Sequence, residues 1–481
     1  MIVMKFGGTS VGSGQRIAQL GRIVAAVAAE RNAPPVVVVS AMSGVTDSLV
    51  RAAQTAAAGD GRTYTLVRDE LQQRHEQAIA DCGIGPEPAR GLRAEVTGLL
   101  DWFETLCQSM HTLGELTPRG LDVVSGLGER LSARLTVAAL LGQDIPAQMV
   151  EATEIIVTTD RFGGAQPLFE ETTARARARV LPLVEAGIAP VVTGFIAATI
   201  DGVPTTLGRG GSDYSATILA RCLPADEVWI WTDVDGVMTA DPRIVPEART
   251  LPGISFGEVA ELSYFGAKVL HPQTIAPIVD AGIPVRVLNS LHPERPGTLV
   301  SQRVVGAPVV KGITAIRDLS LITVEGRGMQ GVPGVAGRVF SAVARSGANI
   351  LMITQSSSEQ SICFVVRTVD ARAAVDALQA EFDRELGRQD IHRIGRDDEA
   401  SIVAVVGAGM RGRPGIAAAV FGALAEAEIN IISIAQGSSE YNLSLVVTNG
   451  DVDLAVRAIH HRFQLAEALA TPDPEQEGVL R

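Results

Sequence analysis

The sequence predicts an α/β protein in which a mainly parallel sheet is sandwiched by helices and is followed by two smaller α+β modules. In the first part of the chain, short β-branched runs alternate with longer Ala/Leu-rich stretches of helical spacing. In the last third the chain repeats itself, with Asn349-Ile350 matched by Asn430-Ile431, 81 residues further on. The alternation predicts the sheet, and the repeat predicts the two modules.

The expected strands are short apolar runs, at Ile2 to Phe6, Pro35 to Ser40, Pro190 to Ala197, Glu227 to Val234 and Pro284 to Asn289. The clearest helical spacing is found at Arg16 to Glu30, Gly128 to Leu141 and Phe169 to Gly187. Residues 60 to 118 carry little strand signal, so we expect a helical insertion there. Ligands of such sheets gather at the carboxyl ends of the strands.

A Pro-rich segment, His292 to Gly297, predicts a linker between the two parts. We therefore expect a first domain at residues 1–295 and two modules at residues 305–395 and 396–470. The repeat runs without a gap. Each copy predicts a strand, a Gly/Pro loop, a helix, two strands and a helix, in that order.

The composition indicates a soluble enzyme of 481 residues, 46% of them hydrophobic, with a formal charge of −13. This charge argues against a nucleic-acid surface, which needs Lys and Arg to neutralise phosphates. The four cysteines are scattered without the spacing of a metal site or a disulfide framework, which fits a reducing cytoplasm. The apolar run before Lys5 is too short for a signal peptide, and no stretch is long enough to span a membrane. We expect a cytoplasmic protein and assign no residue to a metal site.

A glycine motif typical of dinucleotide binding occurs in both copies of the repeat. Gly407-Ala-Gly409-Met-Arg-Gly412 follows an apolar strand and precedes a helix, and Gly326-Arg-Gly328-Met-Gln-Gly331 stands at the same place in the first copy. Neither copy has a clear acidic residue at the end of the following strand. We interpret the glycines as part of the module's architecture rather than as an NAD site.

The first functional candidate is Lys5-Phe6-Gly7-Gly8-Thr9-Ser10, at the end of the first strand. Glycines let backbone amides approach an anion, and Lys5 adds a compact positive charge. The lysine precedes the glycines here, whereas in a P-loop it follows them. An ordinary strand-to-helix turn with a surface lysine is the alternative interpretation.

The second candidate is Thr206-Leu-Gly-Arg-Gly-Gly-Ser-Asp-Tyr-Ser215. Three glycines around Arg209 suit a loop pressed against a small anion, because the guanidinium can hold a carboxylate through two parallel hydrogen bonds. We expect Ser212 or Asp213 to cap the helix that runs to Cys222. A helix cap with a flexible approach is the alternative.

Two further candidates lie near the end of the first domain. In Trp231-Thr-Asp-Val-Asp-Gly-Val-Met-Thr-Ala-Asp-Pro-Arg243, Thr232 and Asp233 end a buried strand, where a ribose, a base or a metal-bound phosphate could bind, and Arg243 could reach a phosphate. In Tyr264-Phe-Gly-Ala-Lys268-Val-Leu-His-Pro272, Lys268 falls early in a predicted helix, where the dipole disfavours a cation unless an anion is near. A solvated turn and a surface lysine are the alternatives.

Taken in order, KFGGTSV, SAMSGVTD, SGLGERLSA, TTLGRGGSDYSA, WTDVDGVMTADPR and AKVLHP resemble the motif series of the aspartate kinases, within the amino-acid kinase fold. The repeats resemble the paired ACT domains, of βαββαβ order, that follow this fold in that family. The match covers nearly all of residues 1 to 465, and the ordered series is far more specific than any single motif. The ACT segments are similar to the threonine-sensitive kind found fused to homoserine dehydrogenase.

The resemblance implies ATP- and Mg²⁺-dependent phosphorylation of the side-chain carboxylate of L-aspartate, a first step toward lysine, threonine and methionine. It implies a catalytic role for Lys5, Arg209 and Asp213. The implied nucleotide site comprises Lys5, Gly7, Gly8, Ser10, Thr232, Asp233, Met238, Arg243, Lys268 and Val269. The implied aspartate site comprises Thr46, Glu129, Arg209, Gly210, Gly211, Ser212 and Asp213.

In the ACT segments the resemblance implies feedback by an amino-acid effector, threonine or lysine. The implied effector residues occupy matching positions in the two copies, namely Asn349, Ile350 and Gln355, and Asn430, Ile431 and Gln436. The alternative is that these amides only satisfy an interface between the modules. ACT domains commonly pair their sheets, so the resemblance also implies a homodimer or larger homo-oligomer, with no nucleic-acid or membrane partner.

The implied reaction fits the residue types. A carboxylate nucleophile has a reference pKa of about 4, so it is ionised at neutral pH and needs no His or Cys base. The difficulty is to bring one anion up to another, which calls for positioning and positive charge. A glutamate kinase of the same fold and a non-catalytic amino-acid sensor are the competing interpretations.

Overall fold

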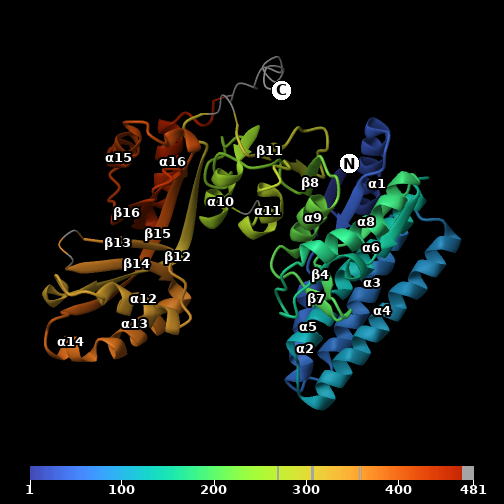
Figure 1. Cartoon of the computed structure of the whole chain (residues 1–481), viewed down its shortest axis with the longest axis horizontal. Coiled ribbons are helices and arrows are strands. Elements are labelled where there is room, and N and C mark those ends of the chain that lie inside the picture. Colours follow the sequence, from blue (N-terminus) through green and yellow to red (C-terminus); the bar gives the residue numbers. More distant parts are fainter. Residues whose placement is uncertain (268–269, 305–307, 357, 359, 468–481) are drawn as a thin grey trace. The chain divides into compact units, whose positions relative to one another are not determined.

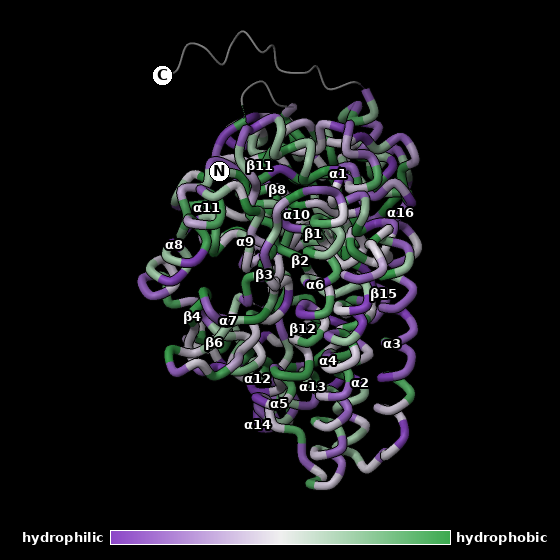
Figure 2. The backbone as a smooth tube through the Cα atoms, turned by 90° about the vertical axis from the view of Figure 1, so that its right-hand side faces the viewer, coloured by the Kyte–Doolittle hydropathy of each residue, from purple (hydrophilic) through white to green (hydrophobic). Residues whose placement is uncertain are grey.

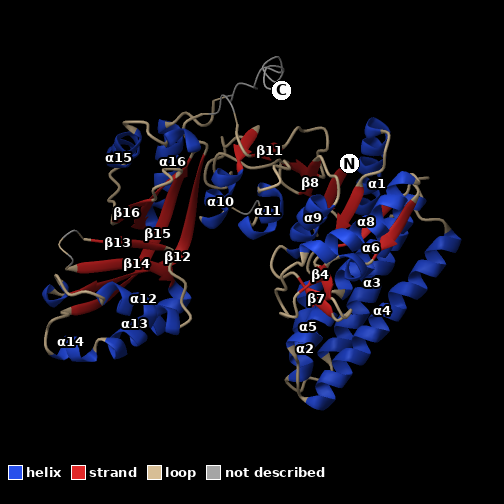
Figure 3. Ribbon diagram, in the orientation of Figure 1, coloured by secondary structure: helices blue, strands red, loops and turns tan. Residues whose placement is uncertain are grey.

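Strand β1 (Ile2–Phe6) lies near the middle of an eight-stranded sheet in the order β3-β5-β2-β1-β8-β10-β11-β9 (Figure 3). The other strands are β2 (Val36–Val39), β3 (Ala147–Val150), β5 (Ala189–Thr193), β8 (Glu227–Thr232), β9 (Gly253–Ser255), β10 (Val285–Asn289) and β11 (Thr298–Ser301). From β3 to β10 all neighbouring strands run parallel, and β11 is antiparallel to β10. The predicted mainly parallel sheet is therefore confirmed.

The computed structural model describes residues 1–267, 270–304, 308–356, 358 and 360–467. The chain divides into two compact units. The first comprises Met1–Val237, Pro252–Phe256 and Leu270–Arg303, and the second comprises Met238–Leu251, Gly257–Val269 and Val304–Arg481. The predicted boundary at residue 295 falls just before β11, which pairs with the sheet of the first unit. No helix in the described part of the chain is long and apolar enough to cross a membrane.

The helices of the first unit are α1 (Gly14–Arg31), α2 (Val45–Ala57), α3 (Thr63–Asp81), α4 (Pro86–Leu113), α5 (Pro118–Ser125), α6 (Leu127–Leu141), α7 (Ala152–Ile155), α8 (Phe169–Glu185), α9 (Gly211–Cys222) and α11 (Pro272–Val279). The expected helical insertion consists of α3 and α4, which lie side by side (Figure 1). In Figure 2 both helices carry hydrophobic and hydrophilic residues. Leu71 and Phe103 from their apolar faces join the core that also covers the sheet, so the insertion packs as an extension of the main core.

The prediction of a single strand at Pro190 to Ala197 is wrong. The structure has two strands there, β5 and β6 (Ile196–Thr199). Between them Phe195 has a φ of 66°, and its backbone N–H donates to Ser215 Oγ at 2.9 Å. This left-handed residue interrupts the ladder. Strand β6 therefore joins a separate three-stranded sheet with β4 (Val157–Thr158) and β7 (Pro204–Thr206).

The second unit contains a six-stranded antiparallel sheet in the order β13-β14-β12-β15-β17-β16. Its strands are β12 (Gly312–Glu325), β13 (Met352–Gln355), β14 (Ser361–Arg367), β15 (Arg393–Val406), β16 (Ser433–Gln436) and β17 (Asn442–Thr448). Its helices are α10 (Phe256–Tyr264), of which Phe256 belongs to the first unit, α12 (Val335–Arg345), α13 (Thr368–Glu381), α14 (Asp383–Gly387), α15 (Ile416–Glu426) and α16 (Val452–Arg462). Each copy of the repeat has the predicted order of strands and helices.

The two copies of the repeat share their strands. Residues 312–316, at the start of β12, pair with residues 402–406 of the second copy, and residues 393–397 of β15 pair with residues 321–325 of the first. Ile313 accordingly packs in the core of the second copy, whereas Ile394 packs against the core of the first. The strands of each copy are therefore completed by a segment that stands at the start of the other copy in the sequence.

The paired glycine motifs are explained by this packing. A Cβ at Gly326 would lie 2.2 Å from the carbonyl oxygen of Asp390, and a Cβ at Gly407 would lie 2.2 Å from that of Val309. Asp390 and Val309 occupy equivalent positions in front of the two strand segments that the copies exchange. The glycines therefore allow the same close backbone approach twice, which supports their interpretation as module architecture.

Candidate active site

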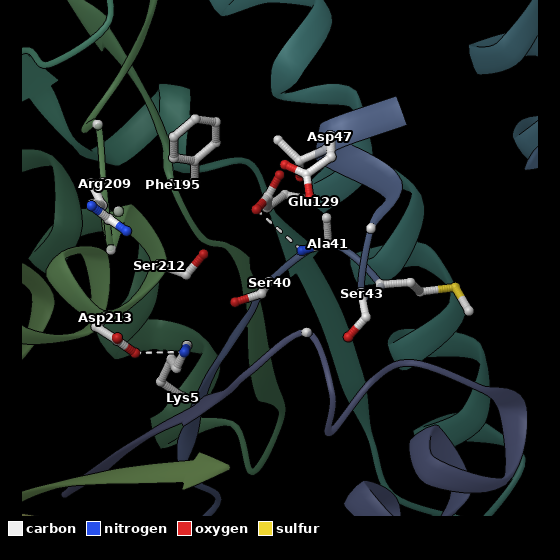
Figure 4. A pocket seen from close by; sticks show the side chains of 17 residues that line it. Lys5, Ser40, Ala41, Ser43, Asp47, Glu129, Phe195, Arg209, Ser212 and Asp213 are labelled. Carbon is white, nitrogen blue, oxygen red and sulfur yellow. Dashed lines mark hydrogen bonds and ion pairs between the residues drawn. The ribbon is translucent and has the colours of Figure 1, made fainter. Parts of the chain in front are cut away.

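A cavity of about 440 Å³ lies in the first unit at the carboxyl ends of β1 and β2 (Figure 4). It is lined by Lys5, Gly8, Ser40, Ala41, Met42, Ser43, Gly44, Thr46, Asp47, Glu129, Phe195, Gly208, Arg209, Gly210, Gly211, Ser212 and Asp213. The cavity brings together residues from β1 and the opening loop, from the β2–α2 loop and the start of α2, from α6, and from the glycine-rich loop and the first turn of α9. All seven residues predicted for the aspartate site line it.

Lys5 reaches this cavity from the sheet itself. Its ammonium forms an ion pair with Asp213 Oδ1 at 2.5 Å, and its side chain is only 10% exposed. Strand β1 is hydrogen-bonded on both sides, to β2 and β8, so the backbone of Lys5 is held firmly. A buried ammonium needs a partner, and Asp213 supplies it.

Glu129 presents an unsatisfied oxygen to the same cavity. Its Oε1 accepts the backbone N–H of Ala41 at 3.1 Å, whereas its Oε2 is buried without a hydrogen-bond partner among the described residues. Burial raises the pKa of this carboxyl to about 8, although the Ala41 N–H and the positive charge of Lys5 act in the opposite direction. Glu129 is therefore placed to accept hydrogen bonds from a cationic ligand group, beside Asp47 (Figure 4).

The loop before α9 has the conformation that its glycines allow. Gly208 and Gly210 have φ values of 75° and 70°, in the left-handed region, and the Arg209 side chain between them is exposed. Figure 4 shows Arg209 across the cavity from Asp47. An exposed guanidinium at the mouth of the cavity is available to a carboxylate from solvent.

The prediction that Ser212 or Asp213 caps α9 is wrong. The helix begins at Gly211, and Gly210 is its N-cap residue without a side-chain hydrogen bond. The left-handed conformation of Gly210 starts the helix one residue before Ser212. Ser212 and Asp213 therefore lie in the first turn, where Asp213 is free to pair with Lys5.

Asp122, at 3% exposure, organises the loop and was missed by the sequence analysis. Its carboxylate accepts the backbone N–H groups of Gly163 and Thr206 at 3.0 Å and the Thr206 hydroxyl at 2.8 Å. Thr206 ends β7, two residues before Gly208. The sequence did show an acidic residue among the apolar positions of a short helix. That pattern alone does not indicate which groups the carboxylate binds.

The remaining residues of the opening loop lie beside the cavity. Ser10 Oγ is 2.8 Å from Ser290 Oγ, and the Gly7 N–H donates to the Trp231 carbonyl at 3.0 Å. Ser290 also donates its hydroxyl to the Thr232 carbonyl at 3.0 Å. The structure therefore brings Gly7, Ser10 and Thr232 together at the ends of β1, β8 and β10, with Asp233 following Thr232 directly.

The other predicted nucleotide residues are placed differently. Met238 and Arg243 belong to the second unit. The exposed Arg243 guanidinium pairs with Asp241 at 2.6 Å. Lys268 and Val269 lie outside the described residues, and the next described helix, α11, begins at Pro272.

Of the predicted effector residues, Gln355 lines a cavity of about 330 Å³ in the first copy of the repeat. The other lining residues are Met329, Gly331, Val332, Pro333, Gly334, Val335, Ala336 and Ile362. Asn349 and Asn430 are exposed, and Ile350 and Ile431 pack against the cores of their own copies. Gln436 ends β16, which contacts β13 because the Thr354 hydroxyl donates to the Ile434 carbonyl at 3.1 Å. The two glutamines thus end adjoining strands.

Comparison with known families agrees with this architecture. Residues 1–289 match the amino acid kinase family, and residues 322–382 and 403–463 each match an ACT domain. The parallel sheet with its lysine–glycine loop, followed by the interleaved repeats, thus defines an amino acid kinase domain with two ACT domains.

Individual proteins that this chain resembles narrow the class. The chain is 38% identical to a bifunctional aspartokinase/homoserine dehydrogenase of Arabidopsis thaliana over 96% of this chain and 51% of that protein. It is 32% identical to the lysine-sensitive aspartokinase 3 of Escherichia coli over 96% and 98%. The crystal structure of E. coli aspartokinase III with aspartate and ADP superposes with a TM-score of 0.78 at 31% identity, covering 96% of this chain and 99% of that one. The chain belongs to the aspartokinase family, and it spans about half the length of the bifunctional relatives.

Proposed function

We propose that the chain catalyses ATP-dependent phosphorylation of the side-chain carboxylate of L-aspartate to 4-phospho-L-aspartate. The observation that carries the proposal is the single cavity that holds Lys5, Glu129 and Arg209. A dicarboxylic amino acid has one ammonium group and two carboxylate groups. In this cavity Glu129 would bind the ammonium group, and the positive charges of Arg209 and Lys5 would attract the carboxylates.

Substrate binding follows from the charges in the cavity. Glu129 Oε2, which is buried, would accept the aspartate ammonium, and the hydroxyl groups of Thr46 and of the buried Ser212 line the same cavity. Arg209 would hold a carboxylate through paired hydrogen bonds. Gly210 and Gly211 would let the ligand approach the backbone closely, because neither carries a side chain.

Lys5 would act on the group that is transferred. The attacking carboxylate is already ionised, so the barrier lies in moving it toward the negatively charged γ-phosphoryl group. The Lys5 ammonium is held by its ion pair with Asp213. It would offset negative charge on the phosphoryl oxygens while the group moves from ATP to the aspartate carboxylate. Asp213 would keep the ammonium oriented.

The nucleotide would bind at the adjoining strand ends. Gly7, Gly8 and Ser10 would contact its phosphates, and Thr232 and Asp233 its nucleoside. For Met238, Arg243, Lys268 and Val269 the family resemblance alone supports a nucleotide role. Among the described residues no group of three or more His, Cys, Asp or Glu side chains could hold a metal ion. Mg²⁺ prefers to keep waters and phosphate oxygens as ligands, so it would be held by ATP, where it would neutralise phosphate charge.

The relatives support this proposal and its regulation. Structures of E. coli aspartokinase III have been solved with aspartate and ADP, and with lysine and aspartate. By analogy, threonine or lysine would bind at the cavity that Gln355 lines, and Asn349 and Ile350 lie shortly before Gln355 in the chain. The equivalent candidates of the second copy are Asn430, Ile431 and Gln436. A homodimer or larger assembly would form through the ACT domains.

The direct test is phosphorylation of amino acids by the purified chain with ATP and Mg²⁺, trapping the acyl phosphate as its hydroxamate. We expect hydroxamate from aspartate and none from glutamate. Turnover of glutamate alone would assign the chain to another kinase of this fold, and binding of amino acids without turnover would indicate a sensor.

A further inference from the structure

Phe195 forms part of the wall of the cavity that holds Lys5 and Glu129, and it is half-buried. It is the only aromatic residue among the described residues that line this cavity. In Figure 4 its ring is seen between Arg209 on one side and Glu129 and Asp47 on the other. Arg209 and Glu129 are the side chains proposed to hold a carboxylate and the ammonium of the ligand. The carbon chain of such a ligand would therefore lie near the ring.

The backbone of Phe195 is fixed by residues on both sides of the glycine-rich loop. Its φ of 66° lies in the left-handed region, which a bulky residue rarely adopts. Its N–H donates to the Oγ of the buried Ser215 on α9, and its carbonyl accepts the N–H of Leu207, both at 2.9 Å. A conformation of this kind persists only where the surrounding structure holds it, and such residues cluster at binding and catalytic sites.

Two glycines bring Phe195 close against the start of α9. A Cβ on Gly211 would lie 2.5 Å from the Cδ2 atom of the Phe195 ring, and a Cβ on Gly194 would lie 2.7 Å from the Cβ of Ser212. Both distances are shorter than the contacts that real Cβ atoms make. The ring therefore rests directly on the backbone at the first turn of α9, and it has no room to move toward this helix when a longer ligand enters.

We propose that the Phe195 ring sets the length of the substrate, so that the cavity admits L-aspartate and rejects L-glutamate. The two acids carry the same charged groups and differ by one methylene, so the charges of the cavity do not distinguish them. The longer chain must bow sideways to keep its ammonium and its reacting carboxylate in the same places, and a fixed ring denies it that space. The inference deepens the proposed function and rests on it, because that proposal assigns ligand groups to Arg209 and Glu129.

Three substitutions separate the ring from its backbone and from general packing. Phe195→Gly removes the ring and keeps the backbone, because glycine adopts a positive φ without strain. Phe195→Leu replaces the ring by a smaller apolar side chain. Phe169→Leu is the matched control. Phe169, the first residue of α8, is also half-buried, and its ring packs 4.0 Å from the Arg221 guanidinium, but it is not among the residues that line the cavity.

The test compares kcat/KM for aspartate with kcat/KM for glutamate in the full chain, using the hydroxamate assay. One methylene in an apolar pocket is worth about 10- to 200-fold in specificity. We therefore expect Phe195→Gly to gain turnover of glutamate, with its preference for aspartate reduced by roughly tenfold or more, while Phe169→Leu keeps the preference of the parent. A purely structural role would lower both activities and give no such gain. An undiminished preference in folded Phe195→Gly, or the same gain in Phe169→Leu, would overturn the proposal.

A binding measurement separates this inference from the proposed function. Calorimetry without ATP gives the affinities of each chain for aspartate and for glutamate, and circular dichroism confirms that each chain is folded. If the parent turns over neither acid, these affinities decide. Tighter binding of aspartate by the parent, with a smaller difference in Phe195→Gly, then supports the inference although the proposed function fails. Equal affinities in the parent, or the full difference in Phe195→Gly, would refute it. Should Phe195→Gly fail to fold, Phe195→Leu decides by the same comparisons.

Discussion

Two buried ionisable side chains, one basic and one acidic, line the cavity, and their surroundings give them different chemistry. The Lys5 ammonium already has the Asp213 carboxylate as its partner. The Glu129 carboxylate has one satisfied oxygen and one without a partner in the described structure. A buried group left unsatisfied costs stability, and a ligand that satisfies it recovers that cost. Lys5 is therefore suited to offset the charge of a transferred phosphoryl group, and Glu129 is suited to bind the ammonium group of the substrate.

Lys5→Ala should lower kcat by about 100-fold or more, because it removes the charge that would offset the transferred phosphoryl group. The fold should survive, because Asp213 at 19% exposure can be hydrated once the ammonium is gone. Turnover is measured by the hydroxamate assay and stability by urea unfolding. Lys5→Arg is the control that keeps the charge. Near-normal turnover of Lys5→Ala would remove Lys5 from the catalytic role.

Glu129 predicts a pH dependence of stability. Burial raises the pKa of the Glu129 carboxyl in the folded chain to about 8 from its ordinary value of 4.5. As pH rises through this window the unfolded chain releases the proton and the folded chain retains it, so this group lowers the free energy of unfolding until the pH exceeds about 8. Glu129→Gln has no such proton, so its stability relative to the parent should rise between pH 5 and pH 8. Urea unfolding at several pH values checks this, and a difference that does not change with pH would contradict it.

The same residue predicts a trend in substrate affinity. The ammonium of aspartate prefers the ionised carboxylate, so the KM for aspartate should fall as pH rises from about 6 toward 8. Glu129→Gln should have a higher KM for aspartate that changes little with pH. Initial rates at saturating ATP measure both. A parallel pH trend in the parent and the variant would assign the trend to another group.

At the scale of elements, the sequence analysis predicted strands and helices better than the points where they turn. The runs at β1, β2, β8 and β10 are rich in β-branched residues and are buried by helices on both faces, so local preference and tertiary packing agree. The break at Phe195 and the start of α9 at Gly210 depend on single left-handed residues. Phe195 takes that conformation because its N–H finds Ser215, a contact between residues twenty positions apart. Local patterns do not contain such contacts.

Asp122 allows the element scale to be tested. Asp122→Asn keeps the size of the side chain but turns one acceptor oxygen into a donor that faces the N–H groups of Gly163 or Thr206. We expect a loss of about 1–3 kcal/mol in the free energy of unfolding. The KM for aspartate should rise, because Thr206 leads into the loop that carries Arg209. Unfolding curves and substrate kinetics measure the two effects, and Ser125→Ala, on the same helix, is the control. A stable variant with an unchanged KM would show that the loop does not need this anchor.

At the scale of the whole molecule, the sequence predicted which residues line the cavity better than it predicted their grouping with other parts of the chain. Motifs from four segments meet in one cavity because parallel strands place their carboxyl ends at one edge. The sequence did not predict that residues 238–251 pack in the core of the second ACT domain, nor that the two copies exchange strand segments. Both depend on pairing between residues far apart in the chain, which an alternation of strands and helices does not specify.

The repeat itself leads to the last prediction. Gln355 and Gln436 occupy matching positions at the ends of adjoining strands, and Gln355 lines the cavity of the first copy. If that cavity holds the effector, Gln355→Ala should raise the concentration of threonine or lysine needed for half inhibition by about tenfold, because it removes a hydrogen-bonding amide from the bound amino acid. Each amino acid is titrated separately in the aspartate phosphorylation assay, with Ser341→Ala on the exposed face of α12 as the control.

Comparison of Gln355→Ala with Gln436→Ala then separates sensing from packing. The copies share strands, so a change that only loosened the interface between them should affect inhibition from either position alike. A site in the first copy should give a much larger shift for Gln355→Ala, and two equivalent sites should give similar shifts with a lower Hill coefficient for each variant. Unchanged inhibition in both variants would remove both glutamines from the effector site. The first copy would then need another means of holding an effector.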